Sequence, residues 1–156
     1  RAVIASEDQN FYKHKGFDFT AIQKAYEDNQ KKKKIRGGST ISQQTAKNLF
    51  LWNGGGYFRK GLEAVFTFTI EKVWNKKIIL ERYLNSIEMG QGVFGIEAAS
   101  KYYFGKSSKD LTKSEAAWIA VVLPSPKKYD PKNPTRAMQR KHARVLKQMN
   151  YMTLED

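Results

Sequence analysis

Hydrophobic residues recur along this chain at the three- and four-residue spacing of helices, and no stretch alternates as a β-strand does. The spacing predicts helices over residues 20–30, 41–49, 57–73, 78–87, 96–104 and 113–123, followed by a mixed and basic last helix. Glycine and proline fall between these segments, where they end helices and form turns. We therefore expect a mainly α-helical fold, and the length of 156 residues predicts a single domain, 1–156.

Local polar patterns locate several helix ends. Thr112 and Glu115 have the spacing of a capping box ahead of the apolar run that ends at Leu123. Gly105 is expected to end the helix 96–104. A bend is expected just before that helix, where the chain has Gly90, Gly92 and Gly95.

Two helices carry polar residues whose positions bear on function. In the helix 57–73 one apolar stripe contains Phe58, Leu62, Val65, Phe66, Thr69 and Val73. This leaves Arg59 and Glu63 together on another face, either as a surface salt bridge or as part of a site. In the apolar helix 78–87, Glu81 and Asn85 are expected to point to polar partners inside the domain.

Charge narrows the possible partners. The formal net charge is +13, and residues 31–36 place five positive charges in six positions. Such an excess favours nucleic acid, an anionic membrane surface or a phosphorylated lipid. The chain has no cysteine, which excludes disulfides and thiolate metal sites, and its longest apolar run, 116–123, is too short to span a membrane. His14 and His142 lack the spacing of metal ligands.

The first candidate for catalysis is the carboxylate pair Glu7 and Asp8, which follows the apolar run 2–5. A carboxyl group at the edge of a buried segment can have a raised pKa, as a general acid or base near neutral pH requires. The alternative is a pair of solvated charges at a helix end. Glu7 is our lead catalytic residue.

The second candidate is the start of the helix 41–49. Gly37 and Gly38 precede it, and Ser39 or Thr40 can cap it, so its free N–H groups form a natural anion site. Gln43 and Lys47 are four residues apart and share one face of this helix. The alternative for these side chains is ordinary helix surface.

Five segments of the chain, in order, resemble the signatures of the peptidoglycan glycosyltransferases of family 51. They are Glu7-Asp8-x-x-Phe11-x-x-His14-x-Gly16, then 37–48, 59–64, 79–85 and 116–124 with 126–131. Because all five occur in the family's order across residues 7–131, the chain is identified as a member of this family. We expect it to be most similar to the monofunctional members, since it ends soon after the fifth segment and leaves no room for a transpeptidase domain. The alternative is a fragment trimmed at both ends.

The resemblance implies a lysozyme-like helical domain with a small, flexible, membrane-facing jaw over roughly residues 17–60. It also implies a transmembrane helix upstream, which we expect to have been removed because the chain begins inside an apolar segment. The expected location is the bacterial inner membrane, with the catalytic domain on the periplasmic side. Members of the family are targets of moenomycin.

The implied reaction polymerises lipid II into β-1,4-linked glycan with inversion and releases undecaprenyl pyrophosphate. Glu7 would be the base, and Glu63 would orient cations. The implied pyrophosphate-binding residues are Ser39, Thr40, Gln43, Lys47, Arg59 and Lys60. The implied supporting residues are Asp8, Phe11, His14 and Gly38. A divalent cation, Mg²⁺ or Mn²⁺, held by Glu63 is left open by the resemblance.

The expected partners are lipid II, the growing lipid-linked glycan, an anionic membrane surface and other cell-wall synthesis proteins, without nucleic acid. One alternative is a lysozyme-like hydrolase or lytic transglycosylase that uses Glu7 as an acid. The segments 37–47 and 59–60 argue against it, because glycan cleavage releases no pyrophosphate. The other alternative, a nucleic-acid-binding module, rests on the charge and 20 aromatic residues, but the usual motifs of such modules are missing.

Overall fold

The computed structural model describes residues 1–30, 38–51 and 55–155. Its elements are α1 (Ala2–Glu7), α2 (Phe19–Gln30), α3 (Ile41–Phe50), α4 (Gly56–Val73), α5 (Lys76–Ser86), β1 (Glu88–Gly90), β2 (Val93–Phe94), α6 (Ile96–Phe104), the 3₁₀ turn η1 (Ser108–Asp110), α7 (Lys113–Val122) and α8 (Arg136–Met149). The expected mainly α-helical fold is confirmed. The lysine-rich run 31–36, Gly37 and the loop residues 52–54 lie outside the described part.

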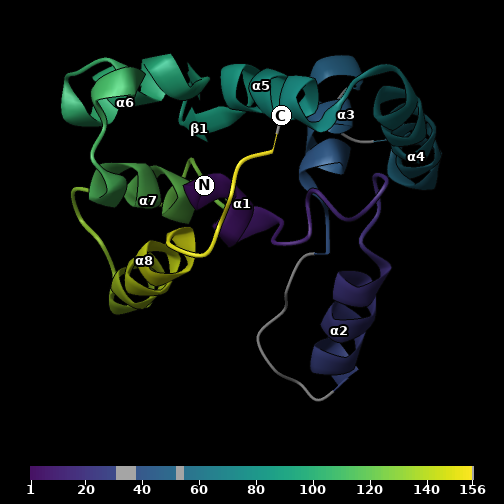
Figure 1. The fold of residues 1–156 in the computed structure, drawn as a ribbon, viewed down its shortest axis with the longest axis horizontal. Coiled ribbons are helices and arrows are strands. Elements are labelled where there is room, and N and C mark those ends of the chain that lie inside the picture. Colours follow the sequence, from purple (N-terminus) through teal and green to yellow (C-terminus); the bar gives the residue numbers. More distant parts are fainter. Residues whose placement is uncertain (31–37, 52–54, 156) are drawn as a thin grey trace.

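The short helix α1 lies at the centre of the molecule, between α7 and α8 on one side and α3 on the other (Figure 1). Its residues 2–5 are buried, and they pack with the apolar run of α7 and with the face of α8 that carries Val145. Because α1 is enclosed in this way, the position of Glu7 at the end of this helix is fixed relative to the core. No helix in the described ranges is both long and apolar enough to cross a bilayer.

The expected helix ends are confirmed. Thr40 and Gln43 form a capping box at the start of α3, and Thr112 and Glu115 form another at the start of α7. Gly105 ends α6 with a left-handed backbone. These features depend on residues within four positions of each other, so the sequence reports them directly.

The glycine-rich bend between α5 and α6 is an antiparallel hairpin of β1 and β2. The sequence predicted the bend but not the strands, because strands of three and two residues are too short to show alternation. Gly90 gives the hairpin its close contact with α6, since a Cβ atom there would meet the hydroxyl of Tyr103 at 2.6 Å.

The apolar stripe of α4 does not pack on the core. Phe58 and Val73 are each 70% exposed and Val65 is 61% exposed, whereas the buried positions of α4 are Glu63, Thr67 and Ile70. Thr67 packs on Gly16, where a Cβ atom would lie 3.0 Å from the threonine methyl group. Periodicity identifies a stripe but not its partner, and here the polar side of the helix faces the protein.

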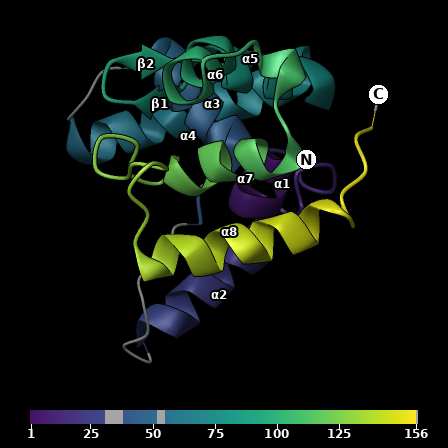
Figure 2. The ribbon, with the colours of Figure 1, turned by 90° about the vertical axis from the view of Figure 1, so that its left-hand side faces the viewer.

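The interpretation of α5 was wrong at two positions. Glu81 and Asn85 are exposed rather than turned to polar partners inside the domain, and the buried residues of this helix are Ile79 and Tyr83. Helix α2 projects away from the remaining helices, below them in both ribbon views (Figures 1 and 2). Within the expected jaw, 17–60, α2 thus stands apart, while α3 packs against α4 and α5.

Candidate active site

Asp8 fastens the loop 8–16 to the start of α3. Its buried Oδ2 atom accepts hydrogen bonds from His14 Nε2 at 2.7 Å and from the Ile41 backbone N–H at 3.0 Å. The Gly16 N–H donates to His14 Nδ1 at 3.0 Å. Because a backbone N–H can only donate, Nδ1 carries no proton and Nε2 carries the proton shared with Asp8. Asp8 and His14 therefore hold the loop in place.

Several polar groups at the N-terminus of α3 have partners within the protein. The Thr40 hydroxyl accepts from the Gln43 N–H at 3.1 Å and donates to the Gly16 carbonyl at 2.6 Å. The Gln43 Oε1 atom accepts from the Thr40 N–H at 2.9 Å. Asp8 is thus one anion at this helix end, bound to its first free N–H group. The buried Thr40 hydroxyl already has both partners and serves to cap the helix, whereas Ser39 is exposed.

A second network, which the sequence did not reveal, joins the loop to α3, α4 and α5. Lys76 Nζ lies 2.6 Å from Glu71 Oε1, which also accepts from the Ser42 hydroxyl at 2.5 Å. Lys76 Nζ lies 4.8 Å from the ring centre of Phe11, a fully buried member of the first signature. Glu71 and Lys76 look like ordinary surface charges in the sequence, and no spacing rule connects them to Phe11.

Glu7 combines burial with an unused oxygen. Its Oε1 atom is buried and has no hydrogen-bond partner in the described residues. Burial raises the pKa of Glu7 above its ordinary value, although the charge of Lys141 and a hydrogen bond from the Gln44 side chain oppose the shift. The negative charge of Asp8 adds to it. A carboxylate with a raised pKa is a stronger base than a solvated one.

Glu63, Arg59 and Lys60 form a cationic cluster around one buried carboxylate. Glu63 is 3% exposed, and its two oxygens lie 3.6 Å from Arg59 Nη1 and 3.7 Å from Lys60 Nζ. These separations exceed hydrogen-bond length. Arg59 Nε and Nη1 and Glu63 Oε2 are buried and lack hydrogen-bond partners in the part of the chain that is described. The cluster therefore keeps unused donors for a further anion.

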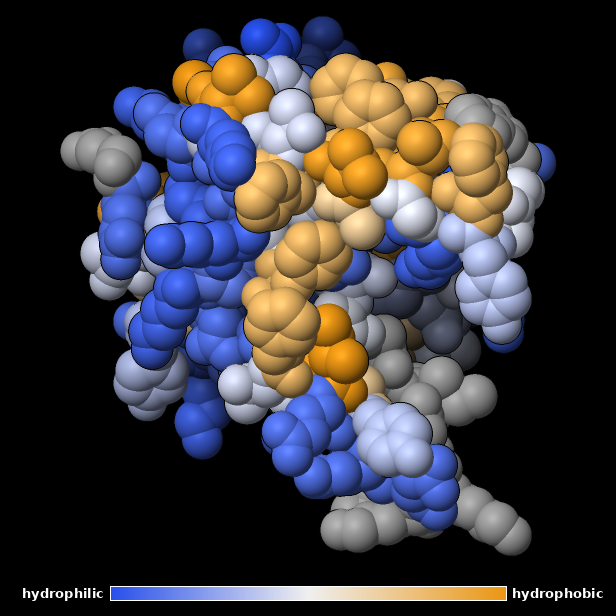
Figure 3. All heavy atoms as spheres, turned by 90° about the vertical axis from the view of Figure 1, so that its right-hand side faces the viewer, coloured by the Kyte–Doolittle hydropathy of each residue, from blue (hydrophilic) through white to orange (hydrophobic). Residues whose placement is uncertain are grey.

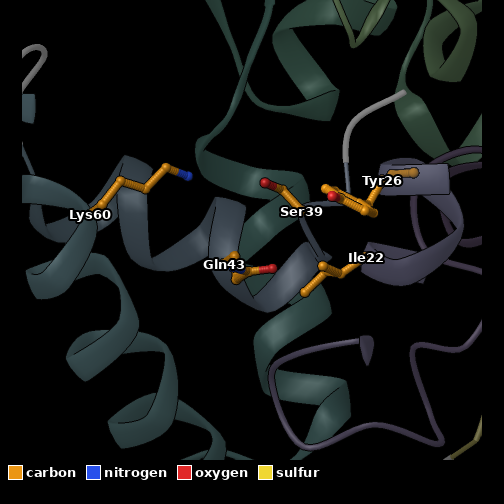
Figure 4. Close-up of a pocket in the computed structure, with 7 residues that line it drawn as sticks. Ile22, Tyr26, Ser39, Gln43 and Lys60 are labelled. Atoms are coloured by element: carbon orange, nitrogen blue, oxygen red, sulfur yellow. The ribbon is translucent and has the colours of Figure 1, made fainter. Parts of the chain in front are cut away.

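A pocket of about 350 Å³ lies beside this cluster, between α2, α3 and α4 (Figure 4). It is lined by Ile22, Ala25, Tyr26, Gly38, Ser39, Gln43 and Lys60. In Figure 4 the Lys60 side chain extends from α4 toward Ser39, with Ile22 and Tyr26 beyond. Gly38 permits the tight approach to α2, since a Cβ atom there would lie 3.2 Å from Ile22.

The structure gathers most of the predicted residues but not all. Lys47 lies on the exposed side of α3 and does not line the pocket. Helix α3 connects the two halves of the site, because Gln43 faces the pocket and the next residue, Gln44, contacts Glu7. Gln44 belongs to the second signature.

The residues around Glu63 do not resemble a metal site. Across the described ranges no three side chains of His, Asp or Glu come together as metal ligands. The charged neighbours of Glu63 are Arg59 and Lys60, and cations would repel a metal ion. The mechanism proposed below takes its positive charge from these side chains.

The raised pKa of Glu7 predicts how the stability of a Glu7→Gln variant depends on pH. The folded protein holds the Glu7 proton more tightly than the unfolded chain does, so the wild type loses stability as pH rises through the raised pKa. Gln does not titrate. We expect the melting temperature of Glu7→Gln, relative to wild type, to increase from pH 4 to pH 8 in thermal unfolding experiments.

Glu97 supplies the control with the opposite sign. Hydrogen bonds from Ser108 lower the pKa of Glu97 to about 2, so its stabilising contribution is present above the unfolded pKa and disappears as pH falls toward 2. The melting temperature of Glu97→Gln should therefore fall further below that of the wild type at pH 8 than at pH 3. A Glu7→Gln difference that is the same at every pH would contradict the burial of an ionisable Glu7.

Comparison with known proteins places this site in a family. The model of the transglycosylase family matches residues 1–150. A biosynthetic peptidoglycan transglycosylase of Mannheimia succiniciproducens is 55% identical over 153 residues, covering 98% of this chain and 63% of that protein. Proteins of the same description from Caulobacter vibrioides and Haemophilus influenzae are each 54% identical, over 94% and 99% of this chain and 64% and 63% of their own length.

The chain therefore belongs to the transglycosylase family, which confirms the resemblance drawn from its five signatures. It spans a little under two thirds of the length of these relatives.

Proposed function

We propose that this domain is a peptidoglycan glycosyltransferase that polymerises lipid II. The observation that carries the proposal is the buried Arg59–Glu63 pair with its unused donors beside the pocket lined by Ser39, Gln43 and Lys60. A pyrophosphate is an anion that such donors would bind. Glu7, with a raised pKa, supplies the base that the same reaction needs.

In the proposed reaction, Glu7 takes the proton of the 4-hydroxyl group of the lipid II acceptor. The hydroxyl oxygen attacks the anomeric carbon of the growing lipid-linked glycan, and the bond from that carbon to the pyrophosphate oxygen breaks. The new β-1,4 bond forms with inversion, and undecaprenyl pyrophosphate leaves with the bonding electron pair. Arg59 and Lys60 stabilise the negative charge on the leaving pyrophosphate, and Glu63 orients these two side chains. Lys47 lies further along α3.

A glycan-cleaving enzyme is the second possibility, since Glu7 could serve as an acid in a lysozyme-like fold. The cationic cluster favours transfer, because hydrolysis of a glycan develops no pyrophosphate charge for Arg59 to stabilise. Incubation of the protein with labelled lipid II, followed by gel separation, tests the choice. Ladders of polymer are expected. Absence of polymer, together with shortening of preformed glycan strands, would support the cleaving enzyme instead.

We further propose that the domain works at an anionic membrane surface in the cell envelope, on the outer side of the inner membrane, where its other partners in cell-wall synthesis would lie. The support is the exposed apolar surface on α2 and α4, which includes Phe19, Tyr26, Tyr57, Phe58, Val65 and Phe68. Figure 3 views the side of the molecule on which α4 lies and shows apolar side chains gathered in a band across it. The basic segment 31–36 would add attraction to acidic headgroups.

We therefore expect the domain to bind vesicles of phosphatidylglycerol and phosphatidylcholine, and salt to weaken the binding. Because burial of one phenylalanine side chain contributes about 1.5–3 kcal/mol, the double variant Phe58→Ser with Phe68→Ser should bind at least about tenfold more weakly in sedimentation assays. The matched control is Phe94→Ser, which removes a 58% exposed phenylalanine from β2. An equal loss of vesicle binding in the double variant and in Phe94→Ser would argue against α4 as the contact surface.

A further inference from the structure

Tyr83 on α5 has no part in the mechanism described above, yet it is fully buried next to the proposed base. Its hydroxyl group donates to Gln44 Oε1 at 3.0 Å. Burial and the charges of Glu7 and Asp8 raise the pKa of Tyr83 well above its ordinary value, so the hydroxyl keeps its proton. Tyr83 is thus a permanent donor to Gln44.

The hydrogen bond from Tyr83 determines which end of the Gln44 amide faces Glu7. A glutamine amide accepts through its oxygen and donates only through its nitrogen. Because Oε1 accepts the Tyr83 proton, the NH₂ group is the end left for Glu7, and Gln44 acts on Glu7 as a hydrogen-bond donor. Without Tyr83 the amide could rotate and bring its oxygen against the carboxylate, where the two would repel each other.

We propose that Tyr83 is a positioning residue for the base: it orients the Gln44 amide, which donates to the Glu7 carboxylate and fixes its orientation. The observations behind it are the hydrogen bond from Tyr83 to Gln44 Oε1 at 3.0 Å and the hydrogen bond from the Gln44 side chain to Glu7. The expected effect on catalysis rests on the proposed function, whereas the orientation of the Glu7 carboxylate does not depend on it.

The test uses Tyr83→Phe, which removes one oxygen atom and keeps the ring in the core. Loss of the oriented donor should raise the pKa of Glu7, measured by NMR titration of ¹³C-labelled glutamate carboxyl groups, while Lys141 and Asp8 continue to act on it. Gln44→Leu removes the donor directly and should raise the same pKa. In the lipid II assay kcat should fall about tenfold, KM should stay unchanged, and the acidic limb of the pH profile should move upward with the pKa.

Tyr103→Phe is the matched control. The Tyr103 hydroxyl also donates within the protein, to the Met89 carbonyl at 2.8 Å, but far along the chain from Glu7. This variant should lose stability without moving the Glu7 titration. Because Tyr83 acts through Gln44, the double variant Tyr83→Phe with Gln44→Leu should match Gln44→Leu alone rather than add to it.

Two outcomes separate this proposal from the proposed function. An unchanged Glu7 titration in folded Tyr83→Phe, or in Gln44→Leu if Tyr83→Phe does not fold, overturns the positioning role whatever the activity. A raised titration in both variants, with a wild type that makes no polymer, leaves the positioning role intact and removes the proposed function.

Discussion

A Glu7→Gln variant is expected to polymerise lipid II about a hundredfold to ten-thousandfold more slowly than wild type, the usual contribution of a general base. Gln keeps the shape of the side chain and its contact with Gln44 but cannot take a proton from the acceptor hydroxyl. Initial rates of polymer formation measure the loss. Binding of moenomycin should change little, because Glu7 is assigned to the base and not to the pyrophosphate cluster.

The pH profile gives the same prediction a second readout. A base must be deprotonated to act, so the wild-type rate should fall as pH drops through the raised pKa of Glu7, and Glu7→Gln should lack this limb. Glu97 is an exposed carboxylate on α6 with a lowered pKa. The pH profile of Glu97→Gln should match that of the wild type. Retention of the acidic limb in Glu7→Gln would assign the titration to another group.

An Arg59→Ala variant is expected to lose about 2–4 kcal/mol of transition-state stabilisation, which corresponds to roughly 30- to 1000-fold in kcat. Arg59 is mostly buried, and its Nε and Nη1 atoms have no hydrogen-bond partners in the described structure, so the substrate would supply their acceptors. Loss of the cation also leaves the buried Glu63 charge with only Lys60 nearby.

The matched control is Arg136→Ala, which removes an exposed arginine at the start of α8. It should polymerise like wild type, while Arg59→Lys should retain more activity than Arg59→Ala because it keeps the charge without the fork of donors. Circular dichroism and melting temperature show whether Arg59→Ala folds. A folded Arg59→Ala variant with the wild-type rate would remove this cluster from the mechanism.

The features that the sequence predicted well are local ones. The helix cap at Thr40, the capping box at Thr112 and the end of a helix at Gly105 depend on neighbours within four positions, so their patterns are sufficient. The apolar stripe of α4 was visible, but a pattern cannot tell whether a stripe meets the core or the outside. The exposed Phe58 and the buried Glu63 show that the polar face of this helix packs inward.

The contacts that the sequence could not predict join distant positions. The Asp8 bond to the Ile41 N–H spans 33 residues, and the Tyr83 bond to Gln44 spans 39. No spacing rule pairs such residues before the fold is known. The five signatures nonetheless pointed to the residues of the candidate site, while the packing explains why Thr40 caps a helix and Ser39 faces the pocket.

The roles proposed for the two glutamates can be separated because their surroundings differ. Burial raises the pKa of Glu7, whereas Glu63 lies between two cations that it would orient. An amide can partly replace a carboxylate that orients cations, since its oxygen still accepts hydrogen bonds. It cannot replace a carboxylate that takes a proton.

The most direct measurement compares Glu7→Gln and Glu63→Gln side by side, in polymerisation of labelled lipid II and in binding of moenomycin. Our account predicts that Glu7→Gln forms polymer about a hundredfold to ten-thousandfold more slowly than wild type but binds the inhibitor nearly as wild type does, while Glu63→Gln retains more activity and binds the inhibitor more weakly. The opposite result, a Glu7→Gln variant that polymerises at the wild-type rate and an inactive Glu63→Gln variant with intact binding, would contradict the assignment of Glu7 as the base.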